Sequence, residues 1–470
     1  MNEDKILKIN KRSFITVCAI LVAFMIAVYI MTFFVEKGMY VELIPGAGLE
    51  YQFIGGTGYS FWRFLGSPLL VFLSEDGLSV LVIGLFILIL GGAFNVIQKT
   101  KGIQSIISYL ISRFKTKKYL LMYIIILAFM LLGSLFGIFE ESVTLLPIIV
   151  ILALSLGWDT FTGLGMCLLA TGFGFSTAIT NPFSIGLATE QMGLRVVEGI
   201  WFRIIIFIIL YLLLCLFMTI HVKKIEKKPE SSPTYESDRE KFAKLNMEEN
   251  FSSYNRRILK TYTLFFVWVL AAIIASSIIP ALQGYSIPVI AISFLIGIFV
   301  CGLAIGEKFA HIGKMFLSGV GSIAPAIVMI ALAASIKFIL QDSQIMGTII
   351  KQIVNWFSGS SPILGILFIY LIILLIQFFI GSASAKVILI IPIISIIATD
   401  LGISQNIALL AFIFGDGFTD LIYPTNPVLL IALGISSFSY TKWVKKTFLL
   451  QLIVLGLTVG FLILGYFLGY

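Results

Sequence analysis

Apolar stretches close to the length of a membrane-spanning helix recur along the whole chain, for example near residues 14, 78, 201 and 447. A helix needs about 20 residues to cross the hydrocarbon core of a bilayer. The composition agrees: 59% of the 470 residues are hydrophobic and 12% are charged, against about 25% charged in soluble domains. Within hydrocarbon the backbone must bond to itself, so we predict an all-α polytopic membrane protein.

Charge in the loops predicts how these helices run. The loop 98–118 carries six Lys or Arg and no acid, whereas the loop 36–76 carries five acids and two basic residues, so the first is predicted inside and the second outside. A re-entrant hairpin at 119–157 places the remaining basic loops inside. If only its second arm were re-entrant, the loop 222–258 would lie outside, so we prefer the first topology. It has nine crossing helices, a second, opposed hairpin at 361–400 and a cytoplasmic N-terminus.

A short polar motif interrupts two of the apolar stretches in the same way. The tripeptide Thr-Asn-Pro occurs at 180–182 and, 245 positions later, at 425–427, and the same offset pairs further glycines and prolines. Irregular backbone is tolerated at membrane depth only where it is buried in protein or lines a water-filled cavity. Matched breaks in two halves are typical of secondary transporters with a substrate site near the midplane. We therefore predict broken helices at 160–188 and 404–435.

The predicted topology makes the two halves inverted repeats, because the first helix of one half runs inward and its counterpart runs outward. A polar linker of mixed charge joins them. The predicted organisation is an N-terminal helix with an outward loop (1–77), a first repeat (78–221), a cytoplasmic linker (222–258), a scaffold helix pair (259–314) and a second repeat (315–470).

The hairpin tips supply the first group of candidate substrate-binding residues. These residues are Glu140, Glu141, Ser142, Ser382, Ser384 and Lys386. Free backbone N–H groups at the start of each second arm, together with the serines, suit a carboxylate. At the 245-residue offset Glu141 corresponds to Lys386, so the two either pair or bind opposite ends of a zwitterion. The alternative is that they reach an interface and only orient the hairpins.

The two breaks supply the second group, Thr180, Asn181, Thr425 and Asn426. Each following proline removes a backbone donor and frees a carbonyl. Side-chain oxygens and freed carbonyls suit a polar substrate group or an alkali cation, so Asn181 and Asn426 are the candidate position for sodium if sodium is the coupled ion. A single motif would be explained better by a locally bonded kink, but two at matched positions favour a site.

Two acids form the third group. Asp416 and Asp420 lie at i and i+4 and so share one helix face. Carboxylates at membrane depth are costly unless they serve a function. They can bind a cationic side chain, coordinate sodium or exchange a proton, because neighbouring like charges oppose joint ionisation. The alternative is that this part of the helix lies in an aqueous vestibule.

Other classes of protein are disfavoured. We find no nucleotide-binding loop, catalytic triad or metal-ligand cluster, so we predict neither an enzyme nor a resident cofactor; the coupling ion, sodium or a proton, stays open. Nucleic acid is not expected as a partner, because the basic residues lie in short loops where they set topology. Paired hairpins do not form the continuous pore of a channel, and a receptor would be expected to carry a soluble output domain.

Four segments carry a resemblance to a known family. They are GGAFNVIQKTKGI, GSLFGIFEESVTLLPIIVILALSLGWD, TGFGFSTAITNPFSIGLA and GDGFTDLIYPTNPVLLIALG. They resemble the YfcC-like branch of the anaerobic C4-dicarboxylate uptake C (DcuC) family, within the ion transporter superfamily. The resemblance implies an elevator-type secondary carrier, a homodimer in a bacterial plasma membrane. The wider family is named for C4-dicarboxylates, whereas YfcC-like members are assigned to basic amino acids, including arginine–ornithine exchange.

The charges of the candidate residues favour the second substrate class. Dicarboxylate carriers of the superfamily typically have a Ser-Asn-Thr tip, where this chain has Glu140, Glu141 and Ser142. Four acids against one lysine repel a dianion by about 4 kcal/mol per pair at 4 Å and an effective dielectric near 20. We therefore predict an arginine- or ornithine-type antiporter, with a sodium- or proton-coupled C4-dicarboxylate transporter as the alternative.

Overall fold

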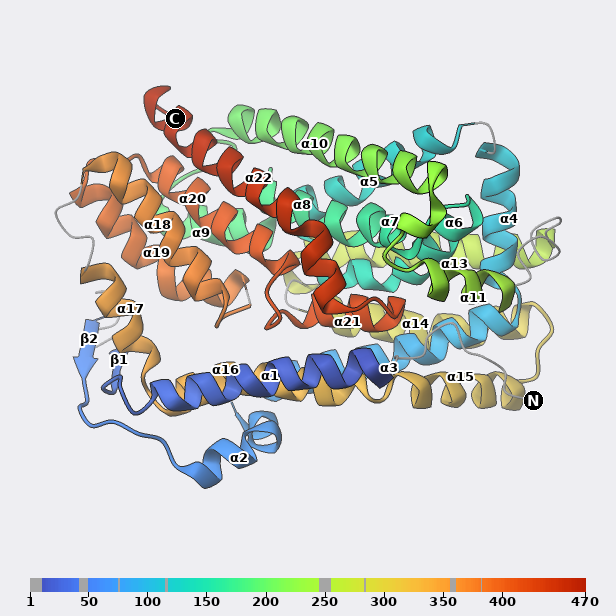
Figure 1. Cartoon of the computed structure of the whole chain (residues 1–470), viewed down its shortest axis with the longest axis horizontal. Helices are drawn as coiled ribbons and strands as arrows, with labels where there is room; N and C mark the ends of the chain where they lie inside the picture. The colour runs from blue at the N-terminus through green and yellow to red at the C-terminus, as the bar shows by residue number, and fades with distance from the viewer. Residues whose placement is uncertain are drawn as a thin grey trace.

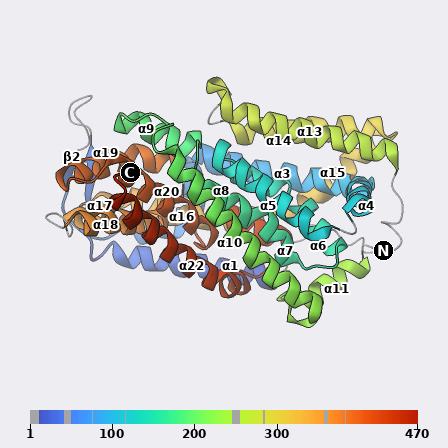
Figure 2. The same cartoon turned by 90° about the horizontal axis from the view of Figure 1, so that it is seen from above.

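The computed structural model describes residues 11–41, 50–74, 77–114, 117–244, 255–282, 285–355, 361–381 and 383–470. The molecule is elongated and nearly all of the described secondary structure is helical, with most long helices close to one common direction (Figures 1 and 2). This confirms the predicted all-α class. The exception is one antiparallel pair of short strands in the loop after the first helix, β1 (Gly38–Val41) and β2 (Glu50–Phe53), which the sequence analysis did not predict.

Seven helices among the described residues are long and apolar enough to cross a membrane, or eight if one bent pair counts as a single span. The bent pair is α15 (Phe309–Ile323) and α16 (Ala326–Asp342), which meet at 44°. This number is smaller than the nine predicted crossings. The apolar part of α1, Cys18–Met31, is shorter than a span, and the second broken helix is divided into two short helices. The number also includes one arm of the first hairpin, Lys118–Phe136.

One side of the molecule is built from long helices that pack pairwise. Helix α1 packs on α16, α3 packs on α15 and on α14, and α13 packs on α14 (Figures 1 and 2). Among these helices, the first four span Lys11–Met31 (α1), Gly77–Lys99 (α3), Arg256–Ile278 (α13) and Ser286–Ala304 (α14). The remaining long helices are α10 (Ile200–Lys227) and α22 (Tyr440–Phe467).

Both predicted hairpins form helix pairs, and they lie toward opposite ends of the molecule (Figures 1 and 2). The first consists of α5 (Lys118–Phe136), η2 (Glu140–Thr144) and α6 (Leu146–Ser155). Helix α5 ends because Gly137 adopts φ +70°, a left-handed conformation that glycine accepts without strain. The second hairpin consists of α18 (Pro362–Gln377) and α19 (Ala383–Asp400).

The two predicted breaks are observed as interruptions of buried helices. The first broken helix comprises α7 (Thr160–Leu164), the π-helical turn η3 (Gly165–Leu169), α8 (Ala170–Thr177), the π-helical turn η4 (Pro182–Gly186) and α9 (Leu187–Met192). The second comprises α20 (Gln405–Gly417), η7 (Phe418–Leu421) and α21 (Pro427–Ser436). Shorter elements complete the chain: α2 (Phe61–Leu70), η1 (Val71–Leu73), α4 (Gly102–Phe114), η5 (Pro229–Ser231), α11 (Tyr235–Lys244), η6 (Pro280–Leu282) and α17 (Met346–Asn355).

Candidate functional site

The first break lies between α8 and η4 and is held by the first hairpin arm. The N–H groups of Thr180 and Asn181 donate to the Ser134 carbonyl of α5 at 3.1 and 3.2 Å. The N–H of Ile179 donates to Ser134 Oγ at 3.0 Å, and Thr180 Oγ1 donates to the Leu135 carbonyl at 3.0 Å. Buried backbone groups need partners, so α5 supplies those that the broken helix has lost.

Close packing of α5 on α8 brings hairpin and break together. A Cβ on Gly174 would lie 2.0 Å from the Met130 carbonyl oxygen, and one on Gly133 would lie 2.3 Å from that of Thr171. Only glycine permits this approach. Ala178, which ends α8, has φ +31°, and a left-handed conformation costs a non-glycine residue about 1–2 kcal/mol. The backbone at the first break is therefore strained as well as buried.

Asn181 caps the helix after this break. Its Oδ1 accepts from the Phe183 N–H at 2.9 Å, and the side chain is fully buried. It faces the hairpin tip, because a Cβ on Gly137 would lie 2.2 Å from Asn181 Oδ1. Its Nδ2 has no hydrogen-bond partner among the described residues. A buried donor without a partner costs free energy, so this amide is available to an acceptor on a ligand.

Asn426 caps the helix after the second break, with both lone pairs of its oxygen engaged. Oδ1 accepts from the N–H groups of Val428 and Leu429 at 2.8 and 3.2 Å. An amide oxygen has two lone pairs, so this one is not free for sodium. Thr425 is partly buried, as is Thr180 at the first break.

Asp420 is the centre of a buried polar group at the second break. Its Oδ1 accepts from Asn426 Nδ2 and from Gln377 Nε2 of α18. Both donors are neutral amides, and the acid is only 4% exposed. The sequence analysis did not assign Gln377 a role. In the sequence, Gln377 stands out as an amide in an otherwise apolar helix. In the structure, Gln377 Oε1 has no hydrogen-bond partner among the described residues.

Lys386 forms an ion pair with Asp416, and both side chains are fully buried. The sequence analysis paired Lys386 with Glu141 or with a substrate carboxylate, or placed it at an interface. In the structure the cation is instead neutralised by the nearest acid of the second broken helix. The reason is that the second arm of its hairpin, α19, packs against α20, which carries that acid.

The remaining tip residues lie in three different environments. Glu141 is buried, and Ser142 Oγ donates to the Phe139 carbonyl at 2.7 Å within the tip. Glu140 faces a cavity of about 20 Å³ whose other lining residues are apolar: Ile83, Phe86, Ile87, Val143, Ile287, Pro427, Val428 and Ile431. Ser382 lies outside the described residues, as does the side chain of Ser384.

The two broken helices pack directly on each other. A Cβ on Gly172 would lie 2.6 Å from the Leu421 side chain, and one on Gly417 would lie 2.3 Å from Ser176 Oγ. These two contacts are equivalent under the 245-residue offset, because Gly172 corresponds to Gly417 and Ser176 corresponds to Leu421. Such reciprocity is expected of elements related by a two-fold axis. The two broken helices therefore pack on each other through the segments that precede their breaks.

The described residues contain no group of three or more His, Cys, Asp or Glu side chains that could hold a metal ion. Asn181 retains one free lone pair on Oδ1, since a single N–H donates to it. The polar groups of this region are thus amide and hydroxyl donors and acceptors together with the charged Lys386, Asp416 and Asp420.

Comparison with known proteins supports a transport role. The family described as C4-dicarboxylate anaerobic carrier matches residues 14–467. A protein of Escherichia coli (strain K12) named "Putative basic amino acid antiporter YfcC" is 29% identical over 391 residues, which are 79% of this chain and 74% of that protein. An uncharacterized protein of Haemophilus influenzae is 28% identical over 404 residues, 83% of this chain and 76% of that one.

Two solved transporter structures are similar at low identity. The YdaH transporter of Alcanivorax borkumensis has a TM-score of 0.41 and 17% identity, covering 97% of this chain and 99% of that one. MtrF of Neisseria gonorrhoeae has a TM-score of 0.42 and 16% identity, covering 96% and 95%. The family match over nearly the whole chain is the stronger result. This chain belongs to the C4-dicarboxylate anaerobic carrier family and is a multi-pass membrane transporter.

Proposed function

We propose that this chain is an antiporter for basic amino acids of the arginine or ornithine type. The observation that carries the proposal is Asp420, a buried carboxylate whose hydrogen-bond donors are two neutral amides. Lys386 also acts on Asp420, but it forms its ion pair with Asp416, so two buried carboxylates share one ammonium group. A buried charge that is only partly balanced is costly, and a guanidinium or ammonium group on the substrate would balance it. The printed name of the Escherichia coli relative agrees with this substrate class.

The same residues suggest how such a substrate is held. Its side-chain cation would contact Asp420 and the free Gln377 Oε1. Its α-carboxylate would accept from Asn181 Nδ2, with free N–H groups at the hairpin tips as further donors. Thr180, Thr425, Glu141 and the tip serines stay candidates for the wall of this site. Lys386 is less suited to bind the carboxylate, since Asp416 already neutralises it.

A C4-dicarboxylate carrier is the second candidate. It is favoured by the description of the matching family and by the unpartnered Asn181 donor. The acids oppose it, because Asp420 and Glu141 would each repel a dianion. A substrate with one cationic and one anionic end satisfies both kinds of group at once, which is why we place the amino acid first.

For the coupling ion we propose a proton on Glu140 in preference to sodium at the breaks. The cavity beside Glu140 has room for about one water molecule, and the other residues that line it carry no titratable side chain. Sodium needs several oxygen ligands, and Asn426 Oδ1 is already engaged. We further propose a homodimer in the bacterial plasma membrane with the N-terminus in the cytoplasm.

The test is uptake of radiolabelled arginine and of succinate into proteoliposomes preloaded with ornithine, succinate or buffer. We expect arginine uptake that requires internal ornithine. Asp420→Asn should reduce it about 30-fold or more, because loss of a buried charge contact costs about 2–5 kcal/mol. Asp342→Asn is the matched control, since that acid pairs with the exposed Arg63. Succinate uptake without arginine uptake would refute the proposed substrate class but not the assignment of this chain as a transporter.

A further inference from the structure

The segment between α10 and α13 docks on the broken helices, although its sequence is that of a polar linker. It contains η5 and α11, and α11 carries charged residues along most of its length. Asp238 of α11 is nevertheless only 7% exposed. An acid is seldom buried unless it is paired, and Asp238 has partners on α7 and in the segment itself.

Asp238 caps the first broken helix at its start. Its Oδ2 accepts from the N–H of Thr160 at 2.8 Å, and its Oδ1 accepts from Thr160 Oγ1 at 2.5 Å. Thr234 Oγ1 also donates to Oδ2, at 2.5 Å. Thr160 is the first residue of α7. The N–H groups at a helix start lack intrahelical partners and carry partial positive charge, so this acid stabilises α7 from outside.

Lys241, one turn later on α11, caps the second broken helix at its end. Its Nζ donates to the carbonyl of Ser436 at 2.8 Å and to Thr160 Oγ1 at 3.2 Å. Ser436 is the last residue of α21, where free carbonyl groups carry partial negative charge. One turn of α11 therefore places an acid on the start of one broken helix and a base on the end of the other.

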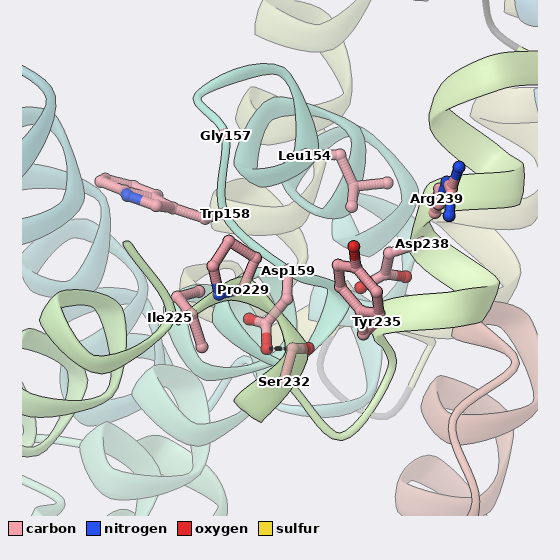
Figure 3. A pocket seen from close by; sticks show the side chains of 10 residues that line it. All are labelled: Leu154, Gly157, Trp158, Asp159, Ile225, Pro229, Ser232, Tyr235, Asp238 and Arg239. Atoms are coloured by element: carbon pink, nitrogen blue, oxygen red, sulfur yellow. Dashed lines mark hydrogen bonds between the residues drawn. The ribbon is translucent and has the colours of Figure 1, made fainter. Parts of the chain in front are cut away.

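Two further contacts fix the segment in place. Ser232 Oγ donates to Asp159 Oδ2 at 2.7 Å, beside a cleft of about 170 Å³ that Asp238 also lines (Figure 3). Lys442, in the first turn of α22, donates to the Pro233 carbonyl at 2.7 Å. Asp159 is the N-cap of α7 and also contacts His221 of α10. The segment thus contacts α7 of the first broken helix, α21 of the second and the start of α22.

We propose that Asp238 and Lys241 are positioning residues that join α7 and α21, so that the two helix breaks move as one rigid body during transport. A transporter in which one break shifted against the other would lose the geometry of the shared site. The proposal rests on the transport function and not on the identity of the substrate. Its opposite is a latch, in which the segment releases the helices in every cycle.

The first test separates helix capping from a simple ion pair. Asp238 and Lys241 are 3.8 Å apart, so exchanging them, as Asp238→Lys with Lys241→Asp, preserves a pair of opposite charges. If the residues act on the helix ends, the exchange places like charge at both ends. The exchange should then reduce the transport rate about tenfold or more, equivalent to about 1.4 kcal/mol, while Asp238→Glu retains most of it. A fully active exchange variant would overturn the proposal.

The second test does not depend on how well these variants fold. Pro233→Cys with Lys442→Cys, treated with a short bis-maleimide to which each thiol adds, links the segment covalently to α22; each single-cysteine variant with the same reagent is the control. Transport is measured with whichever of arginine or succinate the unmodified protein carries, which keeps this test independent of the substrate assignment. We expect the linked protein to transport within about twofold of its controls. Arrest of transport by the link would show a latch and overturn the proposal.

Discussion

Replacing Lys386 by methionine tests the buried ion pair at the second hairpin. Asp416 has no other hydrogen-bond partner among the described residues and is 1% exposed, so Lys386→Met leaves a buried carboxylate without its cation. Breaking a buried pair in this way costs about 3–5 kcal/mol. Methionine retains the length and apolar stem of lysine, so the change is mainly one of charge.

The expected effect on thermal stability follows from the size of the chain. An unfolding entropy of about 2.1 cal/mol/K per residue makes 1 kcal/mol worth about 1 °C for a protein this large. The melting temperature of Lys386→Met in detergent should therefore fall by about 3–5 °C. Adding Asp416→Leu removes the unpaired charge, and apolar replacement of a whole buried pair is often neutral or stabilising, so the double variant should recover most of the loss.

The control is Glu198→Gln, which breaks the exposed pair with Arg195 and should change stability by about 1 kcal/mol or less. Transport by the double variant then separates the two roles of the pair. Recovered stability with transport still lost would assign Lys386 and Asp416 to the mechanism. An unchanged melting temperature in Lys386→Met alone would refute the reasoning, since it would mean that water or a counter-ion already compensates Asp416.

Three further predictions concern other parts of the molecule. Gly174→Ala should lower the melting temperature by about 1–3 °C, the effect of overpacking, because its Cβ would lie 2.0 Å from the Met130 carbonyl oxygen; an unchanged value would contradict the close packing. Burial raises the pKa of Asp159, but His221 and the hydroxyl groups of Thr162 and Ser232 together outweigh this and hold that pKa below its ordinary value. The resulting stabilisation is present above the unfolded-state pKa near 4 and is lost as the pH falls through the folded-state value, so the acid limb of a stability–pH curve should flatten in Asp159→Asn. Transport by Glu140→Gln should become independent of pH, whatever its rate, and a profile like that of the parent would exclude Glu140 as the proton site.

Much of the fold was predictable because a bilayer leaves few options. Apolar length identified the helices, and the Thr-Asn-Pro motifs identified both breaks, since proline removes a backbone donor and the preceding asparagine can cap the helix that follows. The hairpin at Gly137 was predicted from small residues and charge at its tip. The predictions of inverted repeats and of an elevator mechanism rest on the offset and the resemblance, and the equivalent contacts at Gly172 and Gly417 are the structural observation most relevant to them.

The partners of the charged residues were not predictable, because they depend on which helices pack together. Lys386 and Asp416 lie 30 positions apart on different elements, and nothing in the sequence favours that pair over Lys386 and Glu141. Gln377 was similarly ambiguous, since an amide in an apolar helix can bond to any neighbouring helix. The contacts of Asp238 and Lys241 were hidden in a segment whose composition is that of a solvated linker.

The two Thr-Asn-Pro motifs show how one sequence pattern comes to serve two purposes. Both asparagines cap the following helix through Oδ1, so the motif by itself specifies a break and a cap. They differ in Nδ2, which donates to Asp420 at the second break and has no described partner at the first, and in the number of N–H groups that donate to Oδ1, two at Asn426 and one at Asn181. The second repeat carries an acid where the first has Phe175 at the equivalent position. Because of this difference, the second break holds a carboxylate, Asp420, that is already hydrogen-bonded to the Asn426 amide. At the first break the Asn181 Nδ2 donor has no partner among the described residues. This difference is the reason why we propose a substrate with a cation at one end and a carboxylate at the other, since Asp420 would repel a dianion.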